Sequence, residues 1–303
     1  MTRSVVKTQK PTPPIATAST VSSIWRTRRF QNVTTAVLGH AILITLSIVF
    51  LIPLFWMIST ALKDRSQTWL YPPRWIPDPI VWSNFARVFE TGPFLLFLRN
   101  TMILIFWNVL GQVLATTLVA YGFARLRFPG RNFLFMLMIA TLMIPYQVTL
   151  IPTFLLFRAL GWINTYLPLT VPAFTGGAFF IFLMRQYMMT IPLELDDAAR
   201  VDGANRFQVL FRILMPLCKP PLTLVVVFTF LGVWNDFMGP LIYLNDTKTF
   251  PLAIGLNLLR QRYNTDYNLL MAASLMAVIP VLILYFFAQR HIIGGIASVG
   301  LKG

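Results

Sequence analysis

The chain has 303 residues, of which 56% are hydrophobic and only 12% are charged, and its net charge is +15. This hydrophobicity excludes intrinsic disorder. Nucleic-acid-binding domains gather Lys and Arg on one exposed face, whereas long apolar stretches separate the basic residues here, so we expect no nucleic-acid partner and an integral membrane protein instead. One cysteine and two distant histidines give no basis for a metal site.

Residues 1–29 are expected to form a flexible, basic cytoplasmic tail. They include three prolines and a stretch rich in Thr and Ser, without the apolar core of a signal peptide. The tail ends in three arginines directly before the first apolar stretch, which favours a cytoplasmic N-terminus.

Six apolar stretches, almost free of charged residues, follow the tail. Each is long enough to cross a bilayer, which takes about 20 residues, and backbone groups in lipid must be satisfied within the segment. Six such helices in a soluble protein would leave too little polar surface to cover them. The sequence therefore predicts an all-α membrane protein in which residues 30–303 form a six-helix domain. The expected spans are 33–62, 98–124, 132–157, 164–188, 219–244 and 267–290.

The distribution of charge predicts that both termini lie inside. With an inside N-terminus, the inner segments carry 16 Lys and Arg and the outer segments carry nine. The short segment 125–131 alone has three arginines and no acidic residue. An excess of basic residues in inner loops is the usual topology signal of membrane proteins.

The outer segment 63–98 is too rich in proline for a long helix. It also carries several aromatic residues. They are typical of an interfacial belt, and the alternative is that they dock an extracytoplasmic partner.

The inner loop 191–218 is predicted to form two short helices that meet at Gly203. Pro192 can open the first helix, and the acids that follow favour its N-terminal end. The first helix has an apolar stripe at i, i+3 and i+4, formed by Leu195, Ala198 and Ala199. The second has one at i, i+3, i+4 and i+7, formed by Phe207, Leu210, Phe211 and Leu214.

Such a pair can lie on the membrane surface or contact a cytoplasmic partner. Anionic lipid head groups would repel the acids of the first helix, so a protein partner fits better.

The spacing within this loop resembles a known motif. Asp197-Ala198-Ala199 is followed after three residues by Gly203, after nine more by Ile213, and then by Pro216. This is similar to the EAA loop in the membrane subunits of binding-protein-dependent ABC importers. The family pattern begins with Glu and has Leu before the last Pro, where this chain has Asp197 and Met215.

The resemblance covers about residues 30–303 and extends to the carbohydrate-uptake branch. It includes the runs MIPYQVTLIP, VWNDFMGPLIYL and IIGGIASVGLKG. Within this branch, the chain looks like the shorter permease subunit of maltose-type systems. The resemblance implies a multi-pass permease in the inner membrane of a bacterium or archaeon.

The resemblance also implies partners. These are a second homologous permease subunit, two cytoplasmic subunits that bind ATP and Mg, and an extracytoplasmic solute-binding protein. The loop would couple to the ATPases, with Asp197 in charge contact and Gly203 at the bend. The residues expected at this contact are Glu194, Asp197, Ala198, Ala199, Asp202, Gly203, Phe207, Ile213 and Pro216.

Asp236 is the one charged residue inside the fifth apolar stretch, and an acid within a membrane is a functional candidate. With Trp234 and Asn235 it would suit a sugar, through an aromatic face and polar groups for hydroxyls. The alternative is that Asp236 caps a helix break before Pro240 or pairs with a neighbouring helix. Tyr146 and Gln147 are further pathway candidates, beside a kink expected from the nearby prolines, and the alternative is that they form hydrogen bonds between helices.

Two other functions fit parts of the pattern. A secondary transporter or channel also needs several spans but does not need an exposed helix pair in one inner loop. An intramembrane enzyme would need a catalytic motif such as G-x-S-x-G, which the sequence lacks. The chain also lacks the G-x-x-x-x-G-K-[ST] phosphate loop, so an ABC importer would need separate ATPase subunits.

Overall fold

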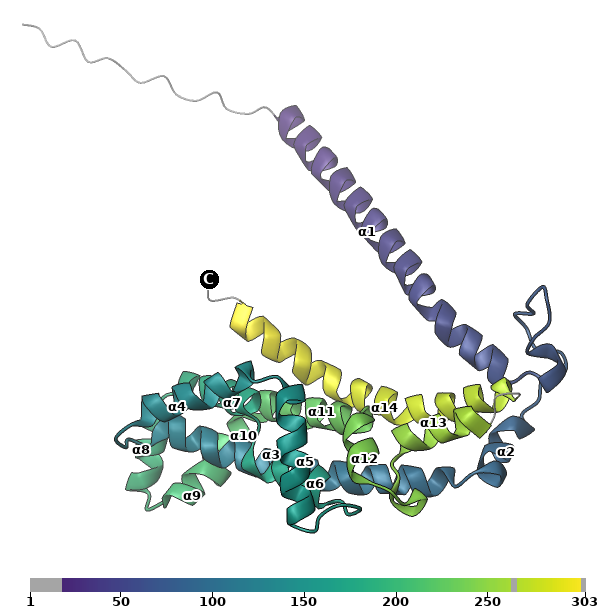
Figure 1. The fold of residues 1–303 in the computed structure, drawn as a ribbon. Helices are drawn as coiled ribbons and strands as arrows, with labels where there is room; N and C mark the ends of the chain where they lie inside the picture. The colour runs from purple at the N-terminus through teal and green to yellow at the C-terminus, as the bar shows by residue number, and fades with distance from the viewer. Residues whose placement is uncertain (1–17, 263–265, 301–303) are drawn as a thin grey trace, which may run out of the picture. The chain divides into compact units, whose positions relative to one another are not determined.

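The structure is a computed structural model that describes residues 18–262 and 266–300 (Figure 1), and within these residues every regular element is a helix. The chain divides into two compact units, Met1–Trp56 and Met57–Gly303.

The first unit consists of most of α1 (Ala18–Ala61), a helix of 44 residues. Its part from Val33 to Ala61 is long and apolar enough to span a membrane, with a mean hydropathy of 2.6. The helix begins at Ala18, so residues 18–29 are helical where the sequence predicted a flexible tail. The last proline of that region is Pro14, and nothing after it prevents a helix from continuing upstream of the span. Residues 1–17 lie outside the described residues.

The second unit contains the remaining helices. The longer ones are α2 (Ser83–Thr91), α3 (Phe94–Arg125), α4 (Arg131–Ala140), α5 (Tyr146–Ala159), α7 (Ala178–Thr190), α11 (Lys219–Trp234), α13 (Leu252–Arg262) and α14 (Tyr267–Gly300). Short helices are α6 (Leu167–Thr170), α8 (Glu194–Val201), α9 (Arg206–Gln208), α10 (Met215–Leu217) and α12 (Met238–Tyr243).

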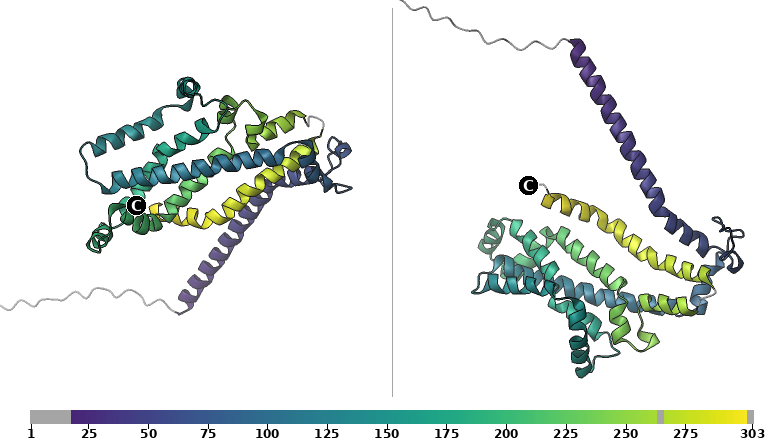
Figure 2. Two further views of the ribbon diagram at one scale, coloured as in Figure 1. Left: turned by 90° about the horizontal axis from the view of Figure 1, so that it is seen from below. Right: turned by 45° about the horizontal axis from the view of Figure 1, so that its top comes forward.

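The long helix α3 runs along the length of this unit (Figure 2) and packs against α7 and α11. One apolar cluster joins its first half to α2, α11, α13 and α14. A second cluster joins its last turns to α7, α8 and the start of α11. Figure 1 shows α8 and α9 at one end of the unit and α2 at the other. The loop 191–218 is therefore packed onto the end of α3 opposite α2.

Four helical segments of the described chain are long and apolar enough to cross a membrane: Val33–Ala61, Phe94–Arg125, Leu167–Thr190 and Tyr267–Gln289. Two more candidates exist only as bent pairs. Arg131–Met143 and Tyr146–Ala159 meet at 99°, and Arg206–Leu217 and Lys219–Trp234 meet at 81°.

The expected spans 132–157 and 219–244 are therefore not continuous helices. The first breaks because Pro145 forces Ile144 into an extended conformation, whereas Pro152 lies inside α5 without ending it. The second ends at Trp234, and α12 starts only at Met238.

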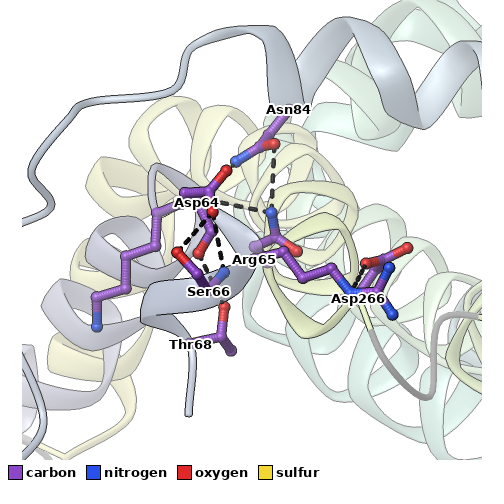
Figure 3. A network of polar contacts seen from close by, with 8 residues as sticks. Asp64, Arg65, Ser66, Thr68, Asn84 and Asp266 are labelled. Atoms are coloured by element: carbon purple, nitrogen blue, oxygen red, sulfur yellow. Dashed lines mark hydrogen bonds and ion pairs between the residues drawn. The ribbon is translucent and has the colours of Figure 1, made fainter. Parts of the chain in front are cut away.

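A network of polar contacts, buried at Asn84 and Asn268, holds the segment after α1 in place (Figure 3). The side chain of Asn84 donates to the carbonyls of Ala61 and Lys63 at 2.9 and 2.8 Å, and Asn268 also donates to the Lys63 carbonyl. Arg65 forms an ion pair with Asp266 at 2.9 Å. Because these partners come from α2 and from the start of α14, the network ties three distant parts of the second unit together.

Gly203 lies between α8 and α9 with φ at +85°, in the left-handed region. A Cβ built there would meet no atom within 4 Å, so the backbone angle and not space requires glycine. This confirms the predicted bend at Gly203.

Gly203→Val is therefore expected to destabilise the bend by roughly 1–2 kcal/mol, because a β-branched residue resists this conformation. Gly203→Asn is the matched control, since Asn tolerates it. Limited trypsin digestion would report the difference as faster cleavage after Arg200 and Arg206 in the Val variant alone. Equal cleavage of both variants would contradict the assignment.

Candidate functional site

The first helix of the inner loop exposes part of its predicted apolar stripe and buries an acidic residue. α8 begins at Glu194, and three acids lie in its first turn as expected. Its buried residues are Asp196 and Ala199, whereas Leu195 and Ala198 are exposed. The predicted stripe of Leu195, Ala198 and Ala199 is therefore divided, with Ala199 packed into the protein and the other two on the outer side. The helix is turned so that an acid faces the protein, because a basic partner lies beneath it.

That partner is Arg125, the last residue of α3. Its Nε lies 3.4 Å from Oδ2 of Asp196, and the two side chains are only 3% and 2% exposed. Arg125 also donates from Nη2 to the carbonyl of Ile191 at 2.9 Å. Burial raises the pKa of the Asp196 carboxyl, and the Arg125 guanidinium acts in the opposite direction. One arginine thus contacts both the entry of the loop and its first helix.

The second helix begins with a capping box that the sequence analysis missed. The side chain of Asn205 accepts from the backbone of Gln208 at 2.9 Å, and the side chain of Gln208 accepts from the backbone of Asn205 at 2.7 Å. An N-cap residue followed three positions later by Gln is the signal that could have revealed it.

The residues that follow form a π-helical turn, Val209–Leu214. Val209, Leu210 and Leu214 are fully buried, but Phe207 is 67% exposed and Phe211 is 39% exposed. The predicted four-residue stripe is therefore split. A wider π turn shifts the register of side chains, and such turns are frequent at functional sites.

The loop consequently leaves a set of large apolar side chains exposed. These are Leu193, Leu195, Val201, Phe207, Phe211 and Leu217, here called the exposed loop residues. Asp197 is also exposed, and it pairs with Arg200 at 3.3 Å. Exposed apolar residues grouped in one segment, with accessible charges among them, are typical of a protein contact surface.

A cavity of about 290 Å³ lies beside the first half of α3. Two of the predicted pathway residues, Tyr146 and Asp236, line it together. Other polar groups come from Asn108, Thr153 and Tyr243, and apolar contacts come from Leu104, Phe157, Pro168, Leu169, Pro172, Gly232, Val233, Gly239 and Pro240. A few polar groups on an apolar wall are the usual composition of a small-molecule site.

Asp236 also has the structural role that the sequence left open. Its carboxylate accepts from the backbone N–H of Gly239 at 3.0 Å, which caps the start of α12. A Cβ at position 239 would lie 2.6 Å from Oδ2 of Asp236, so glycine permits this approach. Capping and lining of the cavity are therefore combined in one residue.

The structure does not bring the other candidates to this cavity. Trp234 is buried in the apolar cluster, where it stacks on Phe230 at 5.4 Å. Asn235 is exposed and donates to the carbonyl of Leu231, and Gln147 is exposed on α5. At a helix break, the order of polar and apolar residues does not predict which side chains face the same side of the chain. The sequence alone therefore could not show which of these residues line the cavity.

Comparison with known proteins agrees with this architecture. Residues 108–296 match the family described as binding-protein-dependent transport system inner membrane component. The arabinooligosaccharides transport system permease protein AraQ of Bacillus subtilis is 33% identical over 85% of this chain and 92% of its own length. The sn-glycerol-3-phosphate transport system permease protein UgpE of Yersinia pestis is 32% identical over 86% of this chain and 95% of its own length.

The fold is also shared with a solved structure. A bacterial ABC transporter involved in the import of the acidic polysaccharide alginate matches with a TM-score of 0.75 and 24% identity, over 92% of this chain and 99% of that chain. The family match supports an ABC importer permease and not the secondary transporter or channel that the sequence pattern left open. The chain belongs to the family of inner-membrane components of binding-protein-dependent transport systems, the permease subunits of ABC importers.

Proposed function

We propose that the chain is one of two homologous permease subunits that together form the path for a sugar or a related polyol. Two separate cytoplasmic subunits would bind and hydrolyse ATP with Mg, and a solute-binding protein would deliver the solute from outside. The substrate class is supported by the relatives, whose names specify arabinooligosaccharides and sn-glycerol-3-phosphate. A second alginate transporter structure, described as a complex with an alginate-bound periplasmic protein, supports the extracytoplasmic partner.

The proposed topology has six spans, with both termini inside. In this arrangement α4 with α5 forms one span and α11 with α12 forms another, whereas Arg206–Leu217, which meets α11 at 81°, belongs to the cytoplasmic loop. The basic residues of 125–131 and of the loop 191–218 then lie on the cytoplasmic side, in accord with the positive-inside rule. Residues 1–29 would form the N-terminal cytoplasmic extension, residues 30–303 the permease domain, and the host membrane would be the inner membrane of a bacterium or archaeon.

The loop 191–218 would bind an ATPase subunit. The observation that carries this proposal is the set of exposed loop residues, held on a base that is itself buried against α3, α7 and α11. A rigid base with an apolar outer side can enter a cleft and transmit force. The contact would include the residues Glu194, Asp197, Ala198, Asp202, Gly203, Phe207, Ile213 and Pro216. Ala199 was also expected at this contact, but it is buried in the cluster around the end of α3 and lies on the inner side of the loop.

The cavity beside α3 would form part of the solute path. Its aromatic residues can stack on the carbon face of a sugar ring, and Asn108, Thr153 and Asp236 can hydrogen-bond to hydroxyl groups. Tyr146 lies at the same cavity and adds a phenol. Trp234, Asn235 and Gln147 stay as weaker candidates, since none of them lines this space.

Phe207→Glu is expected to release the ATPase, because a charge would enter an apolar contact. Loss of a central aromatic anchor weakens binding by about 2 kcal/mol, or roughly thirtyfold. The measurement is the amount of ATPase that co-purifies with the permease. Ile76→Glu, at an exposed apolar residue of the segment 63–98, is the matched control and should retain the ATPase. Full retention by both variants would refute the proposed contact.

Asp236→Asn is expected to lower uptake roughly tenfold, equivalent to about 1.4 kcal/mol, while the complex still assembles. The Asn oxygen can still accept from Gly239, so this variant removes the charge and keeps the cap. Uptake into membrane vesicles would be measured with labelled arabinobiose and with glycerol 3-phosphate. Asp236→Leu removes both and should also disturb assembly. Normal uptake by Asp236→Asn would leave Asp236 with the capping role alone.

A further inference from the structure

The inner loop is attached to more of the protein than the chain connection requires. Through the backbone it joins α7 to α11. The ion pair of Asp196 with Arg125 and the hydrogen bond from Arg125 to the Ile191 carbonyl attach it to a third helix, α3. These two contacts lie at the end of α3, where Arg185 of α7 also donates to the carbonyl of Phe123 at 3.3 Å.

The pair is suited to hold a fixed geometry. Arginine presents a planar fork of donors, and here Nη2 donates to the Ile191 carbonyl while Nε lies 3.4 Å from the Asp196 carboxylate, an ion pair without a hydrogen bond. Apolar contacts such as that of Ala199 with the cluster around α3 can slide, whereas an ion pair excluded from water fixes one register.

Stability alone does not explain such a pair. Taking two charges out of water offsets most of their attraction, and replacing a buried pair by apolar residues is often neutral for stability. What the pair adds is conformational specificity, because only one orientation of α8 brings Asp196 to Arg125. A single substitution would leave one buried charge without a partner, and this destabilises a protein more than replacing both residues of the pair.

The same helix leads to the cavity. Asn108 lines the cavity and lies 17 residues before Arg125 on α3, a distance of about 25 Å along the axis. We propose that Arg125 is a positioning residue for transport: it fixes α8 to α3, so that the two helices move as one body and movement of the loop reaches the cavity directly. This inference rests on the proposed function of the loop.

The test is a distance measurement in the assembled complex with its ATPase subunits. Spin labels would be placed on α3 at Leu118 and on α8 at Arg200, both exposed and neither among the proposed contact residues, in a Cys218→Ala background. In the parent protein the label distance should be single and equal without nucleotide and in the ATP–vanadate trapped state. In the double variant Arg125→Met with Asp196→Leu, which leaves no buried charge, the single distance should be lost in the trapped state.

Two further variants separate position from charge. The exchanged pair Arg125→Asp with Asp196→Arg should recover the single distance, at least in part. Arg99→Met removes an exposed arginine from the other end of α3 and should behave as the parent. A label distance that changes in the parent protein, or that stays single in the apolar double variant, would overturn the proposal.

The outcome is distinguishable from a failure of the proposed function. If Phe207→Glu keeps the ATPase bound, the loop is not the ATPase contact, whatever the label distance. If Phe207→Glu releases the ATPase but the apolar double variant keeps one label distance, the contact holds and the role of Arg125 does not.

Discussion

The packing of α3 supports most of the second unit. Both apolar clusters include side chains from this helix, one from each half. Its polar residues also have a defined task. Asn100 donates to the carbonyls of Lys248 and Phe250, and Asn108 donates to the carbonyl of Leu169. Irregular backbone within a membrane protein needs such partners, since lipid offers none. Side chains of one regular helix thus donate hydrogen bonds to backbone carbonyls of neighbouring segments that are not helical or form only short helices. This allows an irregular backbone, and a cavity beside it, within the unit.

Local sequence predicted the helices wherever a single physical rule decided the outcome. A long uncharged stretch must be helical in lipid, which accounts for α3 and for the central part of α14. The bend at Gly203 was predictable because a glycine between two helical patterns can adopt a positive φ, which other residues resist. The positions at which helices break were harder to predict. Pro145 ends a helix and Pro152 does not, since only tertiary contacts decide whether the chain continues past a proline.

In the candidate site, too, the nearby sequence predicted some features, whereas others depend on contacts between residues far apart in the chain. The motif spacing directed attention to Asp197, which is exposed, while Asp196 beside it is the acid that the protein buries. Its partner, Arg125, is 71 residues away in the sequence and was interpreted only as a topology signal. Helical periodicity grouped Leu195 with Ala199 in one stripe, but it assigns faces by hydrophobicity and cannot foresee a buried ion pair. Asp236 was identified because a charge in an apolar stretch is conspicuous without any partner.

The proposed function depends most on contact between the outer side of the inner loop and an ATPase subunit. Val201, 88% exposed, and Tyr71, 96% exposed in the segment 63–98, offer matched positions for single cysteines, and the native Cys218 is fully buried. A benzophenone attached through a maleimide to Val201→Cys and photoactivated in the assembled complex should join this position to the ATPase, whereas the same probe on Tyr71→Cys should leave the ATPase unjoined. A product from Tyr71→Cys with none from Val201→Cys would contradict the account.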